Sequence, residues 1–434
     1  MRSDDVAFAL SVPGEEALAW VDSLDFGGSS RVSSSAAVRA RYGERAAALI
    51  DLSTGRRKAV AKLRPESAGG SGSEGWVLGA DAAEQTTPWQ VAHLRARRLS
   101  GRAVHDLTCS VGAELAELTR ECPVVLGSDL DPARAAMARH NVPGALVAVA
   151  DALAPPTRPD ADLVHIADPG RRSGGRRIAD PAAVEPPLPA LLDVLAGRDF
   201  AVKCAPGLDY TALAHGGETE IVSLGGGVKE ACLWSGSLSA GVGRRATVIH
   251  TATRPVAGTE TGAPSRHGDG PSHAADFGRS LDGGGWFETV TDLDPEIGAA
   301  DPDPETDRFL MEPDGAIVRA GLVRHWAFRH SLRQLDPRIA HLTGAEIPAG
   351  YSGFEVLERH GLDLKALRSR FRELDCGSLE ILVRGVDKDP DALRKKLGLK
   401  GKRPLALVIS RVGERAVAYI CGARRHEPTL STKV

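Results

Sequence analysis

The chain has 434 residues, of which 42% are hydrophobic and 26% charged, a composition that indicates a globular protein with more than one domain. It contains no apolar run of about 18 residues and no basic-then-apolar N-terminal segment, so we expect neither a transmembrane helix nor a signal peptide. The net charge of −3 excludes a uniformly basic protein, and the six scattered cysteines, without a CxxC pair, predict a cytoplasmic protein with no metal site and no disulfide framework.

The sequence pattern predicts five consecutive parts. They are a mostly helical region over residues 1–99, an α/β domain over 100–252, a flexible linker over 253–306, a helical connector over 307–344 and a small α+β domain over 345–434. From Tyr351 to the end of the chain, 18 Lys and Arg stand against 11 Asp and Glu, a local net charge of +7. An anionic partner explains this charge, and so does a solvated surface.

Helix signals are clearest in the first third of the chain. Ala-rich and Arg-rich stretches predict helices at Ser33–Ile50 and Arg56–Leu63, and Thr87-Pro88 predicts a further helix with Thr87 as its cap. Asp131 directly precedes a proline and is expected to cap the helix 133–141.

Five short apolar runs alternate with helical stretches between residues 103 and 250, and they predict parallel strands joined by right-handed crossovers. The runs are Ala103–Leu107, Val124–Ser128, Ala145–Ala150, Asp162–Ala167 and Asp199–Ala205. Two later runs, Glu218–Leu224 and Glu230–Ser237, flank three glycines and predict an antiparallel hairpin that closes one edge of the sheet. The expected fold class is therefore α/β, with a Rossmann-like sheet of seven strands, as in methyltransferases.

The first predicted strand ends in Asp106-Leu-Thr-Cys-Ser-Val-Gly-Ala-Glu114, an acid followed by small residues that lead into a helix. Small side chains let the backbone approach a ligand closely, and N–H groups at a helix start face an anionic group. We expect Asp106, Thr108, Cys109 and Gly112 to bind a nucleoside cofactor. A plain tight turn from strand to helix would give a similar loop.

Two further acids follow the next two strands. Asp129, with Leu130 beside it, lies about twenty residues beyond Asp106, at the position where a carboxylate can accept both hydroxyls of a ribose. Asp151-Ala152 follows the third strand, where a carboxylate can accept the amino group of an adenine. Because ligands bind at the carboxyl ends of parallel strands, we expect these acids to contact one cofactor.

The fourth strand ends in Asp168-Pro169, the type of position at which methyltransferases that modify amino nitrogens of bases hold the amine. We expect Asp168 and Pro169 to form the catalytic loop, in which alignment contributes more than general-base chemistry. Four nearby arginines are expected to bind substrate phosphates, although pairing with local acids is the alternative. They are Arg171, Arg172, Arg176 and Arg177.

Lys203 and Cys204 end the fifth strand. We expect Lys203 to contribute to substrate binding, and Cys204, in an apolar run without a base beside it, to be a buried structural thiol rather than a nucleophile.

In the C-terminal third, the range Asp307–Leu342 is expected to be helical. The residues after it alternate between helix-like and strand-like stretches, which are Leu362–Leu374, Ser378–Arg384, Pro390–Leu397, Pro404–Arg411 and Arg415–Cys421.

Several of these segments together resemble a known family. The loop that begins at Asp106 resembles the cofactor loop of the trimethylguanosine synthase-like branch of class I methyltransferases, with Ser110 and Ala113 where that branch has glycines. The chain as a whole is similar to bacterial class I S-adenosylmethionine-dependent methyltransferases with a C-terminal THUMP-like domain. The segments that carry this similarity are Glu84-Gln-Thr86, Asp168-Pro-Gly-Arg-Arg172, Lys203-Cys-Ala-Pro-Gly-Leu-Asp209, Val228-Lys-Glu-Ala-Cys-Leu-Trp234, Glu312-Pro-Asp-Gly-Ala-Ile-Val-Arg319, Tyr351-Ser-Gly-Phe354, Leu379-Glu-Ile-Leu-Val-Arg-Gly-Val-Asp387 and Leu393-Arg-Lys-Lys-Leu397.

The resemblance implies S-adenosylmethionine as the cofactor, with Glu84 and Thr86 at its site, and a base of structured RNA, tRNA or rRNA, as the acceptor. Two alternatives stay open. They are a non-catalytic factor that binds S-adenosylmethionine and RNA, and a methyltransferase that acts on a protein or a small molecule. A nicotinamide oxidoreductase fits poorly, because the GxGxxG motif is absent.

Overall fold

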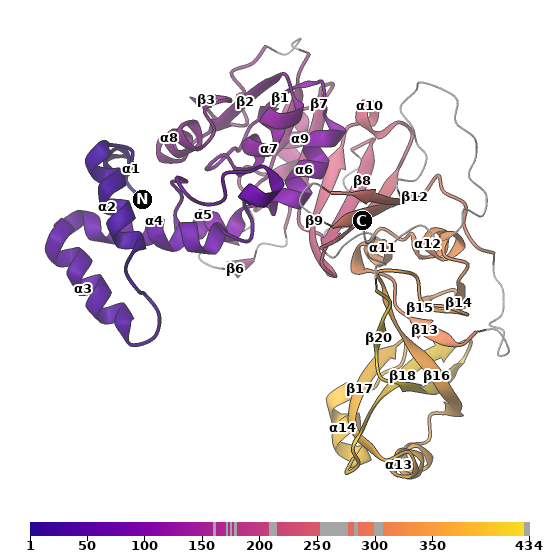
Figure 1. Cartoon of the computed structure of the whole chain (residues 1–434). Helices are drawn as coiled ribbons and strands as arrows, with labels where there is room; N and C mark the ends of the chain where they lie inside the picture. The colour runs from indigo at the N-terminus through magenta and orange to yellow at the C-terminus, as the bar shows by residue number, and fades with distance from the viewer. Residues whose placement is uncertain are drawn as a thin grey trace. The chain divides into compact units, whose positions relative to one another are not determined.

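A computed structural model describes residues 1–158, 162–170, 172–173, 176–177, 180–207, 215–251, 277–281, 285–298 and 307–428 (Figure 1). The chain divides into two compact units, the first made of residues 1–219 and 230–241 and the second of residues 220–229 and 242–434. Among the described helices, none has the length and apolar character needed to cross a membrane.

The first unit begins with a series of helices, and those before residue 60 lie together on one side of it (Figure 1). They are α1 (Ser3–Ala9), α2 (Val12–Asp22), α3 (Ser30–Tyr42), α4 (Ala46–Ala59), α5 (Ala80–Gln85) and α6 (Trp89–Arg98), with short 3-10 turns at Gly43–Arg45 and Glu66–Ala68. The expected cap of α6 is wrong. The helix begins after Pro88 without a side-chain cap, because the hydroxyl group of Thr87 accepts a hydrogen bond from Lys203 instead.

A largely parallel sheet follows in the first unit. Its described elements are β1 (Ala103–Asp106), α7 (Ala113–Glu121), β2 (Val124–Asp129), α8 (Pro132–Asn141), β3 (Leu146–Val149), β4 (Val164–Ala167), α9 (Leu188–Val194), β7 (Asp199–Cys204), β9 (Gly227–Trp234) and α10 (Gly236–Ser239). The strand order is β9-β7-β4-β1-β2-β3. The five predicted parallel strands are confirmed, and β9 pairs with β7 in the antiparallel direction.

One hydrophobic core joins the N-terminal helices to this sheet. It includes Leu18 and Leu52 from the helices, Val104 from β1 and Leu115 from α7, all nearly inaccessible to solvent. The amphipathic faces of the first hundred residues are thus buried against the same core as the strands that carry the predicted cofactor residues.

The predicted hairpin at the edge of the sheet needs a correction. β8 (Glu218–Leu224) and β9 form the hairpin around the glycine turn, but β8 is not the last strand, since the second unit continues in the order β11-β12-β10-β8. These additional strands are β10 (Arg244–His250), β11 (Phe277–Ser280) and β12 (Trp286–Thr291). The sheet therefore has more than the seven strands expected, because β10 and β12 bury apolar side chains of their own.

The predicted linker over 253–306 is also wrong in part. Every residue of β12 is buried, and β12 pairs with β10 and β11. The charge of Glu288 made this segment look unlike a buried strand in the sequence. In the fold, its carboxylate accepts hydrogen bonds from Trp326, Arg329 and Tyr351. Residues 252–276, which gave the linker its composition, lie outside the described residues.

The connector over 307–344 is not simply helical. It contains β13 (Phe309–Met311), α11 (Gly315–Arg319), α12 (Val323–Arg329), β14 (Arg333–Asp336) and β15 (Ile339–Gly344). β15 pairs with β13 and β14, and most of its residues are buried. Pairing with strands distant in sequence outweighs local helix preference here.

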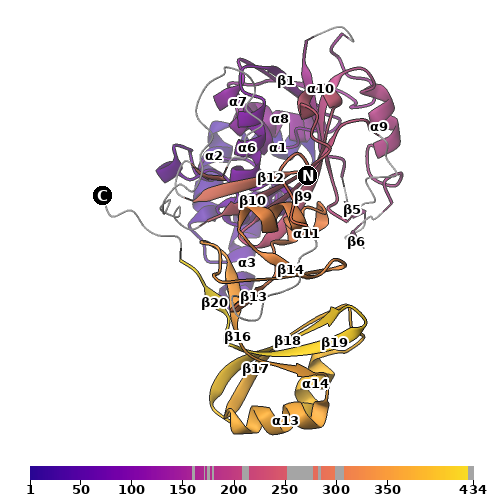
Figure 2. The same cartoon turned by 90° about the vertical axis from the view of Figure 1, so that its right-hand side faces the viewer.

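The C-terminal residues form a second sheet with helices on one face, in agreement with the predicted α+β domain (Figure 2). Its order is β14-β15-β13-β16-β19-β18-β17. The elements not yet given are β16 (Ser352–Gly361), α13 (Leu364–Glu373), β17 (Cys376–Arg384), α14 (Pro390–Leu397), β18 (Arg403–Val412), β19 (Arg415–Gly422) and β20 (Arg425–His426). Asp363 caps α13 and Asp389 caps α14, each through its side chain.

Candidate active site

The loop between β1 and α7 turns through two left-handed backbone conformations. Ser110 has a φ angle of 50° and Gly112 one of 90°. A Cβ atom on Gly112 would lie 3.1 Å from Val142 Cγ2 and 3.3 Å from Ala138 Cα. Glycine is therefore required at 112 both for the backbone conformation and for the close approach to α8.

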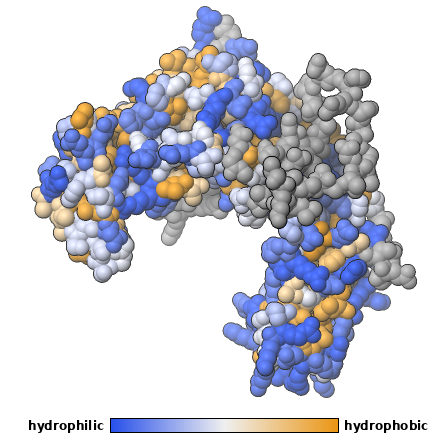
Figure 3. Space-filling model, in the orientation of Figure 1, coloured by the Kyte–Doolittle hydropathy of each residue, from blue (hydrophilic) through white to orange (hydrophobic). Residues whose placement is uncertain are grey.

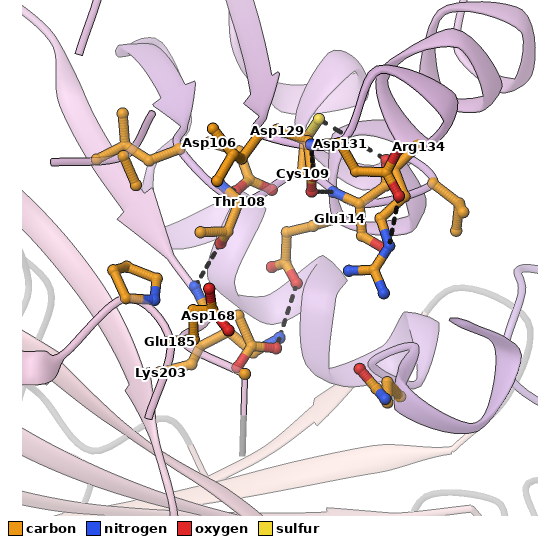
Figure 4. Close-up of a pocket in the computed structure, with 18 of the residues that line it drawn as sticks. Asp106, Thr108, Cys109, Glu114, Asp129, Asp131, Arg134, Asp168, Glu185 and Lys203 are labelled. Carbon is orange, nitrogen blue, oxygen red and sulfur yellow. Dashed lines mark hydrogen bonds and ion pairs between the residues drawn. The ribbon is translucent and has the colours of Figure 1, made fainter. Parts of the chain in front are cut away.

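Two buried carboxylates hold this loop in place (Figure 4). Asp106 Oδ1 accepts a hydrogen bond from the N–H of Thr108 at 3.0 Å, and Asp129 Oδ2 accepts one from the N–H of Ser110 at 3.0 Å. Asp129 Oδ1 also accepts from the N–H of Asp131 at 2.9 Å. Because each carboxylate oxygen can accept more than one hydrogen bond, both groups can still bind a ligand. Asp131 caps α8 as predicted.

These residues line a pocket of about 710 Å³ at the carboxyl ends of the parallel strands. Of the predicted site residues, the pocket brings together Thr86, Asp106, Thr108, Cys109, Asp129, Leu130, Asp151, Ala152, Asp168 and Lys203. Leu130 is 64% exposed and contributes an apolar side chain to the lining of the pocket. This size and mixture of apolar and polar walls are typical of cofactor sites.

Asp168 is fixed at the wall of the pocket by backbone and side-chain contacts. Its N–H donates to Thr108 Oγ1 at 2.7 Å, and its Oδ2 lies 2.7 Å from Lys203 Nζ. Pro169, next to it, is buried. Gly170 then pairs with Glu185 through two backbone hydrogen bonds of 2.7 and 3.3 Å, which keeps Glu185 at the same wall.

Lys203 belongs to a buried network of charges. Its Nζ lies 3.7 Å from Glu114 Oε2 and 3.9 Å from Glu230 Oε2, and Arg95 donates to the same two carboxylates at 2.7 and 2.6 Å. Burial by itself would lower the pKa of Lys203, but the carboxylates of Asp168, Glu230 and Glu114 raise it above its ordinary value. Lys203 therefore carries its positive charge inside the protein.

Burial also acts on the acids and on the thiol of the pocket. It raises the pKa of Asp106 to about 7, with a further contribution from the charge of Glu114, and it raises the pKa of Asp129. The pKa of the Cys109 thiol is raised by burial as well, so this residue is a packing group rather than a nucleophile. A cationic ligand beside Asp106 would favour its ionised form.

Comparison with known proteins identifies the chain. The THUMP domain-like family matches residues 351–423. Over 400 residues the chain is 43% identical to an uncharacterised S-adenosylmethionine-dependent methyltransferase found in two strains of Mycobacterium tuberculosis, and the match spans 89% of this chain and 100% of each relative. The chain belongs to this family of S-adenosylmethionine-dependent methyltransferases.

A solved structure has the same overall fold. It is a methyltransferase from Porphyromonas gingivalis W83, which matches with a TM-score of 0.62 over 97% of this chain and 98% of its own length. At 17% identity this likeness concerns the fold alone.

The cofactor of the methyltransferase is S-adenosylmethionine, and the residues of the pocket fit it. The cofactor bears an ammonium group, a sulfonium centre and hydroxyl groups, all of which favour carboxylate oxygens. The pocket offers Asp106, Asp129 and Asp151, and it also contains Glu114 Oε2, a buried oxygen without a hydrogen-bond partner in the described part of the chain.

Several predicted residues of the methyltransferase lie elsewhere. Glu84 is not in the pocket wall, because its side chain turns to the surface and pairs with Lys58 at 2.5 Å. Lys203 lines the pocket with only 4% of its surface exposed, and its expected role in substrate binding stays a prediction. Arg171 lies outside the described residues, and the other three arginines are described only as backbone of the short strands β5 (Arg172–Ser173) and β6 (Arg176–Arg177).

The sequence did not reveal four residues of the methyltransferase that reach the site or the network behind it. They are Thr87, Arg95, Glu114 and Glu230. Glu230 stands in a segment that carries the family resemblance and Glu114 directly follows another, and a charge within an apolar helix face or strand was the available signal.

Proposed function

We propose that this methyltransferase transfers a methyl group to an exocyclic amino nitrogen of a base in structured RNA, tRNA or rRNA. The observation that carries the RNA assignment is the THUMP domain-like match over residues 351–423. The local charge of +7 supports it, because phosphate contacts supply much of the affinity of RNA-binding proteins.

Exposed basic side chains gather at one end of this C-terminal region. Lys395 and Lys396 at the end of α14 are exposed, as are Lys400 and Lys402 in the connection to β18 and Arg403 at its start. The visible face of the region carries hydrophilic side chains around a hydrophobic strip (Figure 3). Such a cluster suits an RNA backbone, and a protein or small-molecule acceptor would not require it.

In the proposed donor site, Asp106 and Glu114 face the ammonium group, Asp129 the ribose hydroxyls, Asp151 with Ala152 the adenine edge, and Leu130 the adenine face. When bound, the cofactor supplies a methyl group that is already activated by its sulfonium centre. The protein therefore needs to bind, orient and exclude water more than to supply a strong base.

In the proposed acceptor site, Asp168 accepts a hydrogen bond from the amine, and Pro169 keeps the loop rigid. With S-adenosylmethionine held by the donor-site residues, its methyl group would pass to the nitrogen lone pair and the neutral thioether would be left behind. The amine then gives up its extra proton to the Asp168 carboxylate, which exchanges it with solvent. We also propose that the reaction takes place in the cytoplasm, since all six cysteines are buried free thiols.

The test compares modified nucleosides by mass spectrometry in total RNA from cells with the wild-type gene, without it, and with Asp168→Ala. One methylated nucleoside should disappear without the gene and should stay absent with Asp168→Ala, although the purified variant still binds S-adenosylmethionine in calorimetry. If the RNA is unchanged and a protein or metabolite is methylated instead, that molecule is the acceptor and the RNA proposal is wrong. Unchanged RNA without S-adenosylmethionine binding would favour the non-catalytic alternative.

A further inference from the structure

Lys203 is an unusual residue for the wall of a cofactor pocket. Its side chain is 5% exposed, and its ammonium group donates to Thr87 Oγ1 and pairs with Asp168 Oδ2 at 2.7 Å. Asp168 is 29% exposed at the same contact, so it is the member of the pair that can reach an acceptor. A buried ammonium group with these partners is not available to RNA phosphates.

The charges around Lys203 come from every element that packs against it. Glu114 comes from α7, Glu230 from β9, Asp106 from the end of β1, Asp168 from the loop after β4, and Arg95 from α6. Arg95 donates to both glutamates at 2.6 to 2.7 Å, whereas Lys203 lies 3.7 and 3.9 Å from them. The closest ion pair of Lys203 is therefore the one with Asp168.

We propose that Lys203 is a positioning residue, whose buried ammonium group fixes the Asp168 carboxylate in one orientation and keeps it ionised as a hydrogen-bond acceptor for the amine. The proposal rests on the proposed function for the identity of the acceptor group. The contact with Thr87 holds Nζ from a second side, so that the lysine cannot follow Asp168 toward the substrate. An ionised Asp168 offers two acceptor oxygens to the amine and directs the nitrogen lone pair at the methyl group, whereas a protonated carboxyl would present an O–H donor in place of one of those acceptors.

The test uses the full chain with Lys203→Met, Lys203→Arg and Lys203→Met/Asp168→Asn. The matched control is Lys58→Met, which removes a lysine that pairs with the exposed Glu84. Infrared spectroscopy should show an additional carbonyl band of a protonated carboxylic acid in Lys203→Met. Because Asp106, with a pKa of about 7, gives a band of its own near neutral pH, the additional band is measured as the difference from wild type, and it should be absent from Lys203→Arg, the double variant and Lys58→Met.

With radiolabelled S-adenosylmethionine and RNA from cells without the gene, kcat of Lys203→Met should fall by about 100-fold, because a small misplacement near reacting atoms can cost that much. The KM for RNA should stay unchanged, and Lys203→Arg should recover part of kcat. If Lys203 had only a structural role, its substitution would lower the stability of the protein. The infrared band of a protonated Asp168 would then not appear, and kcat would not fall at constant KM.

Two further outcomes decide between the proposals. If wild-type protein methylates no RNA, the acceptor assignment fails, and the infrared band still tests the role of Lys203. If Lys203→Met does not fold, Thr87→Val removes one contact of Nζ and should lower kcat at unchanged KM and unchanged donor affinity. Absence of the band in a folded Lys203→Met, or unchanged kcat in both variants, would overturn the role given to Lys203.

Discussion

The backbone N–H of Asp168 donates a hydrogen bond of 2.7 Å to the hydroxyl oxygen of Thr108. Thr108 belongs to the loop that Asp106 and Asp129 hold in place, so the contact links the donor side of the pocket directly to the proposed acceptor residue. A shift of the loop after β1 is therefore transmitted to Asp168.

This contact predicts different effects for two substitutions of Thr108. Thr108→Val removes the acceptor oxygen while keeping the size of the side chain, and it should lower kcat by about tenfold, the cost of one unsatisfied hydrogen bond near the reacting atoms. Thr108→Ser keeps the oxygen and should stay close to wild type. Steady-state kinetics with the RNA substrate test this difference. Equal kcat values for Thr108→Val and Thr108→Ser would show that the contact has no catalytic effect.

Asp129 holds both the loop at Ser110 and the turn at Asp131. Asp129→Ala should weaken S-adenosylmethionine binding by about 100-fold or more, because it removes the proposed ribose contacts as well as two backbone hydrogen bonds of the site. Asp131→Ala serves as the control, since Asp131 caps α8 and should cost about 1 kcal/mol of stability with little effect on binding. Calorimetry measures the dissociation constant of S-adenosylmethionine for both variants. Equal constants would show that Asp129 does not contribute to the donor site.

Asp106 predicts a pH dependence of donor binding. Its pKa is raised to about 7 by burial, so part of the protein carries it protonated at neutral pH. A bound ammonium group favours the carboxylate, so binding near pH 7 should release protons and the affinity should fall as the pH drops below 7. Calorimetry in buffers of different ionisation enthalpy measures the release, and Asp106→Asn should abolish it.

The same residue affects stability in the opposite sense from an ordinary surface carboxylate. Because the pKa in the folded protein lies above the ordinary value, the folded state binds more protons than the unfolded state between about pH 4 and 7, and the contribution of Asp106 to stability is lost as the pH rises through 7. At pH 8, Asp106→Asn without cofactor should therefore be more stable than wild type by roughly 2–4 kcal/mol, from about 1.4 kcal/mol per pKa unit. Urea unfolding at pH 5 and pH 8 checks the sign.

Glu288 is the main buried acid of the second unit. It accepts hydrogen bonds from Trp326 at 3.2 Å, Arg329 at 3.1 Å and Tyr351 at 2.5 Å, and it is fully inaccessible. Burial would raise its pKa, but the charges of His330 and Arg329 and the bond from Tyr351 lower it to about 2. Its contribution to stability is present above its ordinary pKa of 4.5 and is lost as the pH falls through 2.

Glu288→Gln should consequently destabilise the second unit by about 3 kcal/mol at neutral pH, because it leaves buried cationic partners without their anion. The control Glu296→Gln breaks an exposed pair of 3.5 Å with Arg324 and should cost less than about 1 kcal/mol. Thermal unfolding at neutral pH compares the two, and similar losses would mean that the buried network contributes no more than a surface pair.

Local spacing in the sequence was enough to predict several parts of this protein. Acids at the ends of successive apolar runs placed Asp106, Asp129 and Asp151 at one edge of a parallel sheet, because carboxyl ends of parallel strands meet there. Asp131 was identified as a helix cap for an equally local reason, since capping depends on the next two or three residues.

The surroundings of Lys203 and the extent of the sheets depend on long-range contacts, which local sequence patterns do not contain. Arg95, Glu114 and Glu230 are distant in sequence from Lys203, so neither its burial nor its pair with Asp168 could be read from the chain. β12 was missed because Glu288 looks like a surface residue until Trp326, Arg329 and Tyr351 surround it. In each case a charge was stabilised by partners that only folding brings together, and local preferences contain no information about them.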